Sequence, residues 1–157
     1  DKKRIAIEGN YLMRLGDAET DFLLFEEYFK RIKTAEESRT ILEKLEGLYT
    51  GEYFEDGDWI WAEVKREQLK MQYSDAMLLL SGEYLKEGSF NKAEGLLRKI
   101  YLKDPYFEDV TSLLLRLYLN TNRRNDAVKH YREYEKLLSE ELGISPSPEI
   151  RKIMKEL

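Results

Sequence analysis

The strongest constraint on the fold of this chain is an internal repeat with a period of 34 residues. The repeat pairs Leu80, Tyr84, Ala93 and Leu97 with Leu114, Tyr118, Ala127 and Tyr131. A fixed period of this length is typical of stacked helix pairs, because each pair buries its apolar face against the next. The sequence therefore predicts an all-α chain of antiparallel helix pairs.

The first repeat unit follows the tetratricopeptide consensus at Leu80, Tyr84, Gly88, Phe90, Ala93, Leu97, Ile100 and Pro105. Gly88 can adopt the backbone shape of the turn between paired helices, and Ala93 is small where those helices cross most closely. In the second unit Asn122 stands where glycine is usual, and asparagine tolerates the same left-handed conformation. We therefore expect a tetratricopeptide-like, right-handed stack.

Helical spacing of apolar residues extends through most of the remaining chain. It predicts further helices at about 21–32, 35–49 and 58–85, a loop at 51–58, and a short terminal helix at 148–157 that caps the stack. Residues 1–15 instead alternate between apolar and polar side chains around Gly9-Asn10. This alternation favours a short N-terminal β segment formed by two strands.

Three stretches of the sequence resemble the bacterial transcriptional activator domain. They are Trp61-Ala62-Glu63-Val64-Lys65-Arg66-Glu67-Gln68-Leu69, Asp104-Pro105-Tyr106-Phe107-Glu108 and Glu140-Glu141-Leu142-Gly143-Ile144-Ser145-Pro146-Ser147-Pro148. In that family, which includes antibiotic regulatory proteins and related response regulators, a tetratricopeptide-like domain follows an OmpR-type winged-helix domain. The segment Gly9 to Leu15 is similar to the final wing strand of such a winged helix.

The resemblance implies a division into 1–15, a remnant of the preceding wing or linker, and 16–157, the activator domain. It also implies a regulatory role in oligomerisation or protein–protein contact within a DNA-binding activator. The expected partners are a second copy, as a homodimer, sister domains or RNA polymerase. DNA would be contacted only through the preceding domain.

Composition independently argues against several other functions. Lys and Arg number 26 against 31 Asp and Glu, a formal charge of -5, so the basic field needed to hold a phosphate backbone is missing. The chain has no cysteine, which excludes disulfides, thiolate zinc sites and a cysteine nucleophile. We expect a cytoplasmic protein with no membrane span, metal, cofactor or catalytic residues.

Some residues allow a functional interpretation that we weigh against burial or solvation. His130 has no second ligand type beside it, and we interpret it as a partly exposed helical histidine. Of Trp59 and Trp61 we expect at least one in the core. The basic residues Arg123 and Arg124, with Lys129, His130 and Arg132, are best explained as a solvated face.

A partner groove is predicted on the first helix of each repeat unit, whose inner positions line the concave side of such a stack. The candidate residues are Asp75, Leu78, Gly82 and Leu85, then Asp109, Ser112, Arg116 and Asn120. These residues lack the Lys, Asn and Arg clamp with which chaperone adaptors of this superfamily hold a peptide carboxylate. A free-standing tetratricopeptide adaptor that binds a peptide in this groove remains the alternative function.

Overall fold

The computed structural model describes residues 20–32, 38–51, 53 and 60–155. Its helices are α1 (Asp21–Ile32), α2 (Ser38–Leu48), α3 (Ile60–Lys86), α4 (Phe90–Lys103), α5 (Glu108–Asn120), α6 (Arg124–Leu137) and α7 (Pro148–Met154), with a π-helical turn η1 (Leu138–Leu142) after α6. Every regular element in these ranges is helical, which confirms the all-α prediction. The predicted β segment at 1–15 and most of the predicted 51–58 loop lie outside the described residues.

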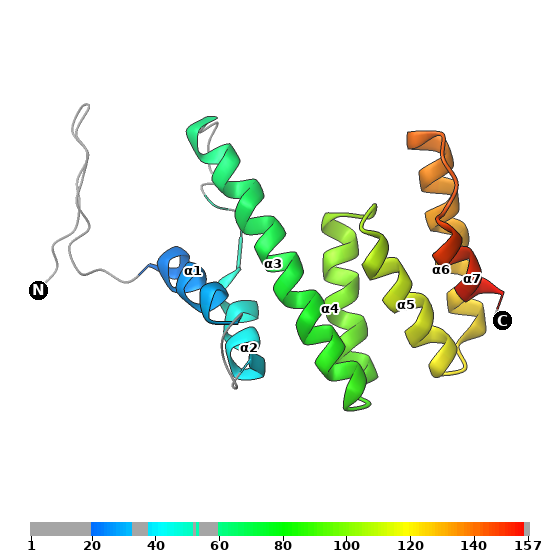
Figure 1. Cartoon of the computed structure of the whole chain (residues 1–157), viewed down its shortest axis with the longest axis horizontal. Helices are drawn as coiled ribbons and strands as arrows, with labels where there is room; N and C mark the ends of the chain where they lie inside the picture. Colours follow the sequence, from blue (N-terminus) through cyan, green and yellow to red (C-terminus); the bar gives the residue numbers. More distant parts are fainter. Residues whose placement is uncertain (1–19, 33–37, 52, 54–59, 156–157) are drawn as a thin grey trace, which may run out of the picture.

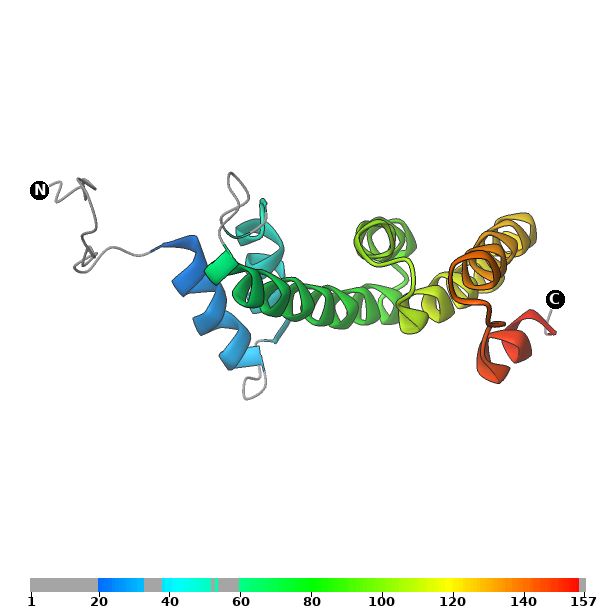
Figure 2. The same cartoon turned by 90° about the horizontal axis from the view of Figure 1, so that it is seen from above.

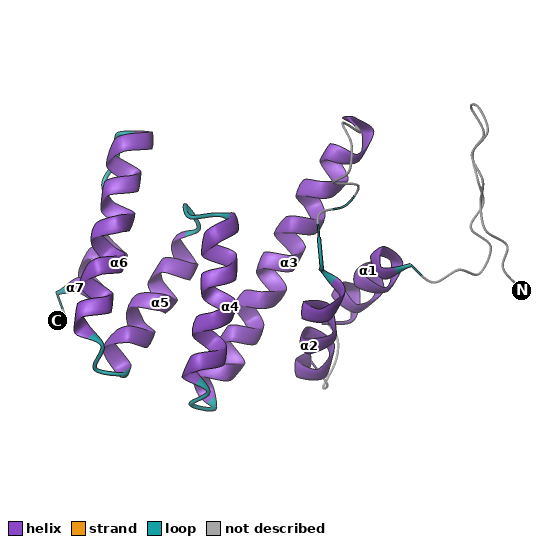
Figure 3. Ribbon diagram, turned by 180° about the vertical axis from the view of Figure 1, so that it is seen from behind, coloured by secondary structure: helices purple, strands orange, loops and turns teal. Residues whose placement is uncertain are grey.

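Successive helices pack against one another in chain order from α1 to α6, and α7 packs against α5 and α6. The helices form a row in Figures 1 and 3. Seen along the other axis in Figure 2, α4 and α6 lie to one side of α3 and α5. The chain therefore alternates between two layers of helices.

The turns that follow α3 and α5 have the same structure, 34 residues apart. Gly88 has φ 76° and Asn122 has φ 56°, so both adopt the left-handed conformation. Each turn is closed by a bond in which the next backbone N–H donates to a tyrosine carbonyl, Ser89 to Tyr84 at 2.8 Å and Arg123 to Tyr118 at 2.7 Å. The expectation that Asn122 can replace glycine in this turn is confirmed.

Replacing Asn122 with glycine should stabilise the protein by up to about 1 kcal/mol, because glycine has no Cβ to strain the left-handed conformation. Asn122→Val should destabilise it by about 1–2 kcal/mol, since a β-branched residue strongly disfavours positive φ. Urea denaturation of the two variants checks both values. Equal stability of the two variants would contradict the assigned turn geometry.

The two repeat alanines occupy matching places. Ala93 is the fourth residue of α4 and Ala127 the fourth of α6, and both are fully buried in the core. The other fully covered repeat positions include Leu80, Leu97, Leu114 and Tyr118. A larger side chain at either alanine would therefore force paired helices apart.

Several helices in the described ranges begin or end at residues that typically cap helices. The backbone N–H of Leu23 donates to Thr20 Oγ1 at 3.3 Å, so Thr20 caps α1. Gly143, at φ 66°, ends the π-helical turn after α6. Ser147 caps α7 by accepting from Ile150 N–H, and Pro148 occupies its first turn.

One prediction about burial is wrong. His130 is only 8% exposed, because its ring packs edge-on against Tyr101 of α4 at 4.8 Å and Tyr118 of α5 at 6.2 Å. The burial of His130 depends on which neighbouring helices cover it, and local spacing does not specify those helices. Trp61 is 63% exposed, and Trp59 lies outside the described residues, so the expectation that at least one of the two is in the core stays a prediction.

Candidate functional site

The predicted groove residues lie on two helices of the same layer. From α3 come Asp75, Leu78, Gly82 and Leu85, and from α5 come Asp109, Ser112, Arg116 and Asn120. None of the eight is buried: both aspartates, Arg116 and Asn120 are exposed, and the others are half-buried. All eight are therefore accessible to a partner.

Arg116 points toward the terminal helix. Its Nη2 lies 3.7 Å from Glu149 Oε1 of α7, and both side chains are at least half exposed. A pair this long and this solvated contributes little to folding. Arg116 can therefore leave Glu149 for an acidic group on a partner at low cost.

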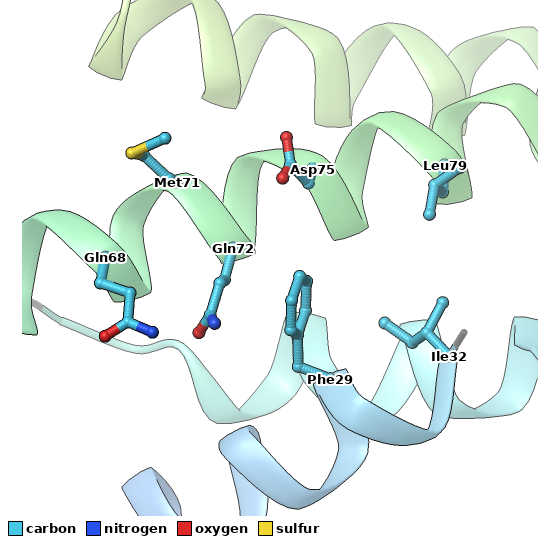
Figure 4. Close-up of a pocket in the computed structure, with 7 residues that line it drawn as sticks. All are labelled: Phe29, Ile32, Gln68, Met71, Gln72, Asp75 and Leu79. Carbon is cyan, nitrogen blue, oxygen red and sulfur yellow. The ribbon is translucent and has the colours of Figure 1, made fainter. Parts of the chain in front are cut away.

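A pocket of about 340 Å³ lies between α1 and α3. Figure 4 shows Phe29 and Ile32 of α1 facing α3 across it, and the α3 wall consists of Gln68, Met71, Gln72, Asp75 and Leu79. Of the predicted groove residues Asp75 lines this pocket, whereas Arg116 contacts α7 instead. A volume of this order can accept a small molecule or a large side chain.

Sequence reasoning missed most of this pocket. Met71 and Leu79 lie on the side of α3 opposite the core residues Leu69, Tyr73 and Met77. The available signal was that α3 carries apolar residues on more than one side, since a helix with a single buried face would be polar on the other.

Comparison of the sequence with models of known protein families gives a match. The model of the bacterial transcriptional activator domain matches residues 20–157, nearly the whole chain. The chain belongs to this family. No curated protein and no solved structure gives a match.

The activator domain family is regulatory and is not known for catalysis. In the part of the activator domain that the structure describes, no three His, Asp or Glu side chains gather as metal ligands. Nor does any helix in the described ranges combine the length and apolarity needed to cross a bilayer.

In the activator domain the carboxylate of Glu94 links α4 to α5 and to the turn between α5 and α6. Its oxygens accept hydrogen bonds from Arg123 and Arg98 and from Tyr118 Oη, the last at 3.2 Å. The bond from Arg123 is the main reason that the pKa of Glu94 is lowered. Burial, helped by the Glu94 charge, raises the pKa of Tyr118 to about 12.

An equivalent contact joins α2 to α3. Tyr84 Oη donates to Glu43 Oε1 at 3.2 Å, and Arg39 Nε donates to the same oxygen at 3.1 Å. Tyr84 and Tyr118 are repeat equivalents, so the activator domain uses one tyrosine–glutamate–arginine arrangement at two successive helix junctions. Of the basic residues predicted to form a solvated face, Arg123 is half-buried in this contact and His130 is buried, whereas Arg124, Lys129 and Arg132 are exposed as expected.

Proposed function

We propose that this domain is the regulatory protein–protein interaction or oligomerisation module of a DNA-binding transcriptional activator. DNA would be bound by a separate winged-helix domain, and this chain would associate with itself, a sister domain or RNA polymerase. The observation that carries the proposal is the activator domain match over residues 20–157. The exposed polar residues on α3 and α5 supply a surface suited to such contacts.

We also propose that the helices form a tetratricopeptide-like stack. Three observations support it: the two matching left-handed turns, the two buried alanines at the fourth position of α4 and α6, and the repeated tyrosine–glutamate junction. In such a stack α3 and α5 would share one concave surface, which would place Asp75, Asp109 and Arg116 in a common groove.

The test attaches the whole chain to a heterologous DNA-binding domain that lacks a dimerisation module, upstream of a bacterial reporter gene. We expect transcription above the level given by the DNA-binding domain alone. Activation could arise from self-association or from contact with RNA polymerase. Sedimentation of the purified chain at several concentrations distinguishes the two, since self-association gives a concentration-dependent mass and polymerase contact does not. The proposal would be overturned if the chain neither activated the reporter nor associated with itself, and if sister domains of the full-length protein did not bind it either.

Arg116→Ala should weaken activation or self-association about fivefold by removing a cation from the proposed groove. The free energy of unfolding should change by less than about 0.5 kcal/mol, because the pair with Glu149 is exposed. Arg132→Ala, at an exposed position of α6, is the matched control and should change neither. If Arg116→Ala left reporter activity and sedimentation both unchanged, Arg116 would not be a partner residue.

A further inference from the structure

The longest helix, α3, has apolar residues on two opposite sides. Its core side carries Leu69, Tyr73, Met77 and Leu80, all buried. On the other side Ile60, Val64, Met71 and Leu79 are 84%, 81%, 67% and 54% exposed. Separations of 4, 7 and 8 residues keep these four on one stripe, about 28 Å long at 1.5 Å per residue. We call these four residues the α3 stripe.

The α1–α3 pocket lies beside the C-terminal part of the α3 stripe. Met71 and Leu79 belong to both, and Phe29 and Ile32 of α1 form the opposite wall (Figure 4). The stripe and the pocket thus join at Met71 and Leu79 into one mainly apolar surface, which also carries the polar side chains Gln68 and Asp75. Amphipathic helices commonly dock in grooves of this kind, with apolar side chains at intervals of three and four residues.

Among the side chains that line this pocket, Asp75 is the charged one. Asp75 is exposed and forms no hydrogen bond or ion pair with any part of the chain that the structure describes, whereas Gln68 Oε1 already accepts from Lys65 Nζ at 3.3 Å. The nearby lysines are already engaged, Lys65 with Glu26 at 2.5 Å and Lys70 with Glu67 at 3.9 Å. An exposed, unpaired carboxylate on an otherwise uncharged pocket wall therefore favours a cationic donor from outside the chain.

We propose that the α3 stripe and the α1–α3 pocket dock an amphipathic helix of a partner protein, which inserts a lysine or arginine side chain into the pocket. The aliphatic stem packs on Phe29, Ile32 and Met71, and the charged head donates to the Asp75 carboxylate. The formal charge of -5 on the chain favours a basic partner at longer range. This inference rests on the proposed function, since it names the surface and the chemistry of one protein partner.

The test uses a designed helical peptide of about 20 residues, long enough to follow the α3 stripe, with leucines on one face and one central lysine. The chain contains 4 Met, which can be labelled with ¹³C at the methyl group. Met71 is an exposed reporter on the pocket wall, and Met77, fully buried in the core, is an internal control. We expect the Met71 signal to shift saturably with the lysine peptide while the Met77 signal stays in place.

Matched variants isolate the ionic contact. Asp75→Asn should weaken binding of the lysine peptide about fivefold to tenfold, as expected for loss of one partly desolvated ion pair. Asp109→Asn, an exposed aspartate on α5, should leave the affinity unchanged. A peptide with glutamate in place of the central lysine should bind at least tenfold more weakly to the unmodified chain. Equal affinity of the two peptides would overturn the charge recognition.

Two further results would overturn the identity of the occupant. If free n-hexylammonium shifted Met71 with the affinity of the peptide, the pocket would be a small-amine site. If Met71 shifted on dilution of the chain alone, a second copy would occupy the surface. If the Met71 signal did not shift with the peptide, the docking proposal would fail and the proposed function would still stand on its own test, because the reporter and sedimentation measurements do not depend on the peptide.

Discussion

Lowering the pH from 7 to 4 should destabilise the domain by about 3 kcal/mol through His130 alone. Burial is the main reason that the pKa of His130 is lowered from 6.5 to about 4, with a smaller contribution from the Arg98 charge, and the nearby Glu133 opposes the shift. The unfolded chain then binds a proton at a higher pH than the native state does. The contribution of neutral His130 to the free energy of unfolding is therefore fully present above pH 6.5, and it is lost as the pH decreases from 6.5 to about 4.

The measurement is direct because the chain has 1 His. Its single imidazole signal, followed by NMR, should titrate with a midpoint near 4 in the native state. Urea denaturation at pH 7 and at pH 4.5 should show the loss in the free energy of unfolding. A native midpoint near the ordinary value of 6.5 would show that His130 is solvated.

His130→Leu is the control variant, because leucine has a similar volume and no titrating group. It should remove most of the pH dependence between 6.5 and 4. The two rings that contact His130 belong to Tyr101 and Tyr118, whose raised pKa values keep them uncharged throughout this range. The Glu94 contribution is lost only below its ordinary pKa of 4.5, since its pKa is lowered in the folded state.

Ala93→Leu should lower the free energy of unfolding by about 1–3 kcal/mol. Ala93 has no exposed surface and belongs to the main core, so three extra carbon atoms must displace packed neighbours between α3 and α4. Urea denaturation should show a lower midpoint with an unchanged slope. Ala127→Leu should behave in the same way between α5 and α6, because it occupies the equivalent position.

Gly95→Ala supplies a contrast within the same helix. Gly95 lies two residues along α4 and is exposed, and a methyl group added to its Cα would meet no other atom within 4 Å. Alanine there should stabilise the helix by about 0.5–1 kcal/mol, because glycine loses more backbone entropy on folding. If Ala93→Leu proved as harmless as Gly95→Ala, the close approach of the helices would not be at Ala93.

The parts of the fold that depend on local patterns could be predicted from sequence. Gly88 and Asp104-Pro105 end α3 and α4 as expected, and Ala93 and Ala127 are buried at the repeat period. These outcomes depend on turn chemistry and helical spacing, both of which are visible within one repeat.

The candidate site was harder to predict, because it depends on packing between distant segments. The α1–α3 pocket combines residues of two helices that are separated by all of α2. Val64 is apolar and yet 81% exposed, and the apolar pattern of α3 does not reveal which side the neighbouring helices cover. His130 was misjudged for the same reason, as its covering rings come from α4 and α5.

The uninterrupted length of α3 has a mechanical consequence. Its 27 residues make a rod about 40 Å long that packs against both α2 and α4. Tilting such a rod by about 5° about one end moves the other end by about 3.5 Å. A change in the orientation of α1 and α2 would therefore tilt α3 as a single rigid helix. Because α4 packs directly against α3, the position of α4 would change with it.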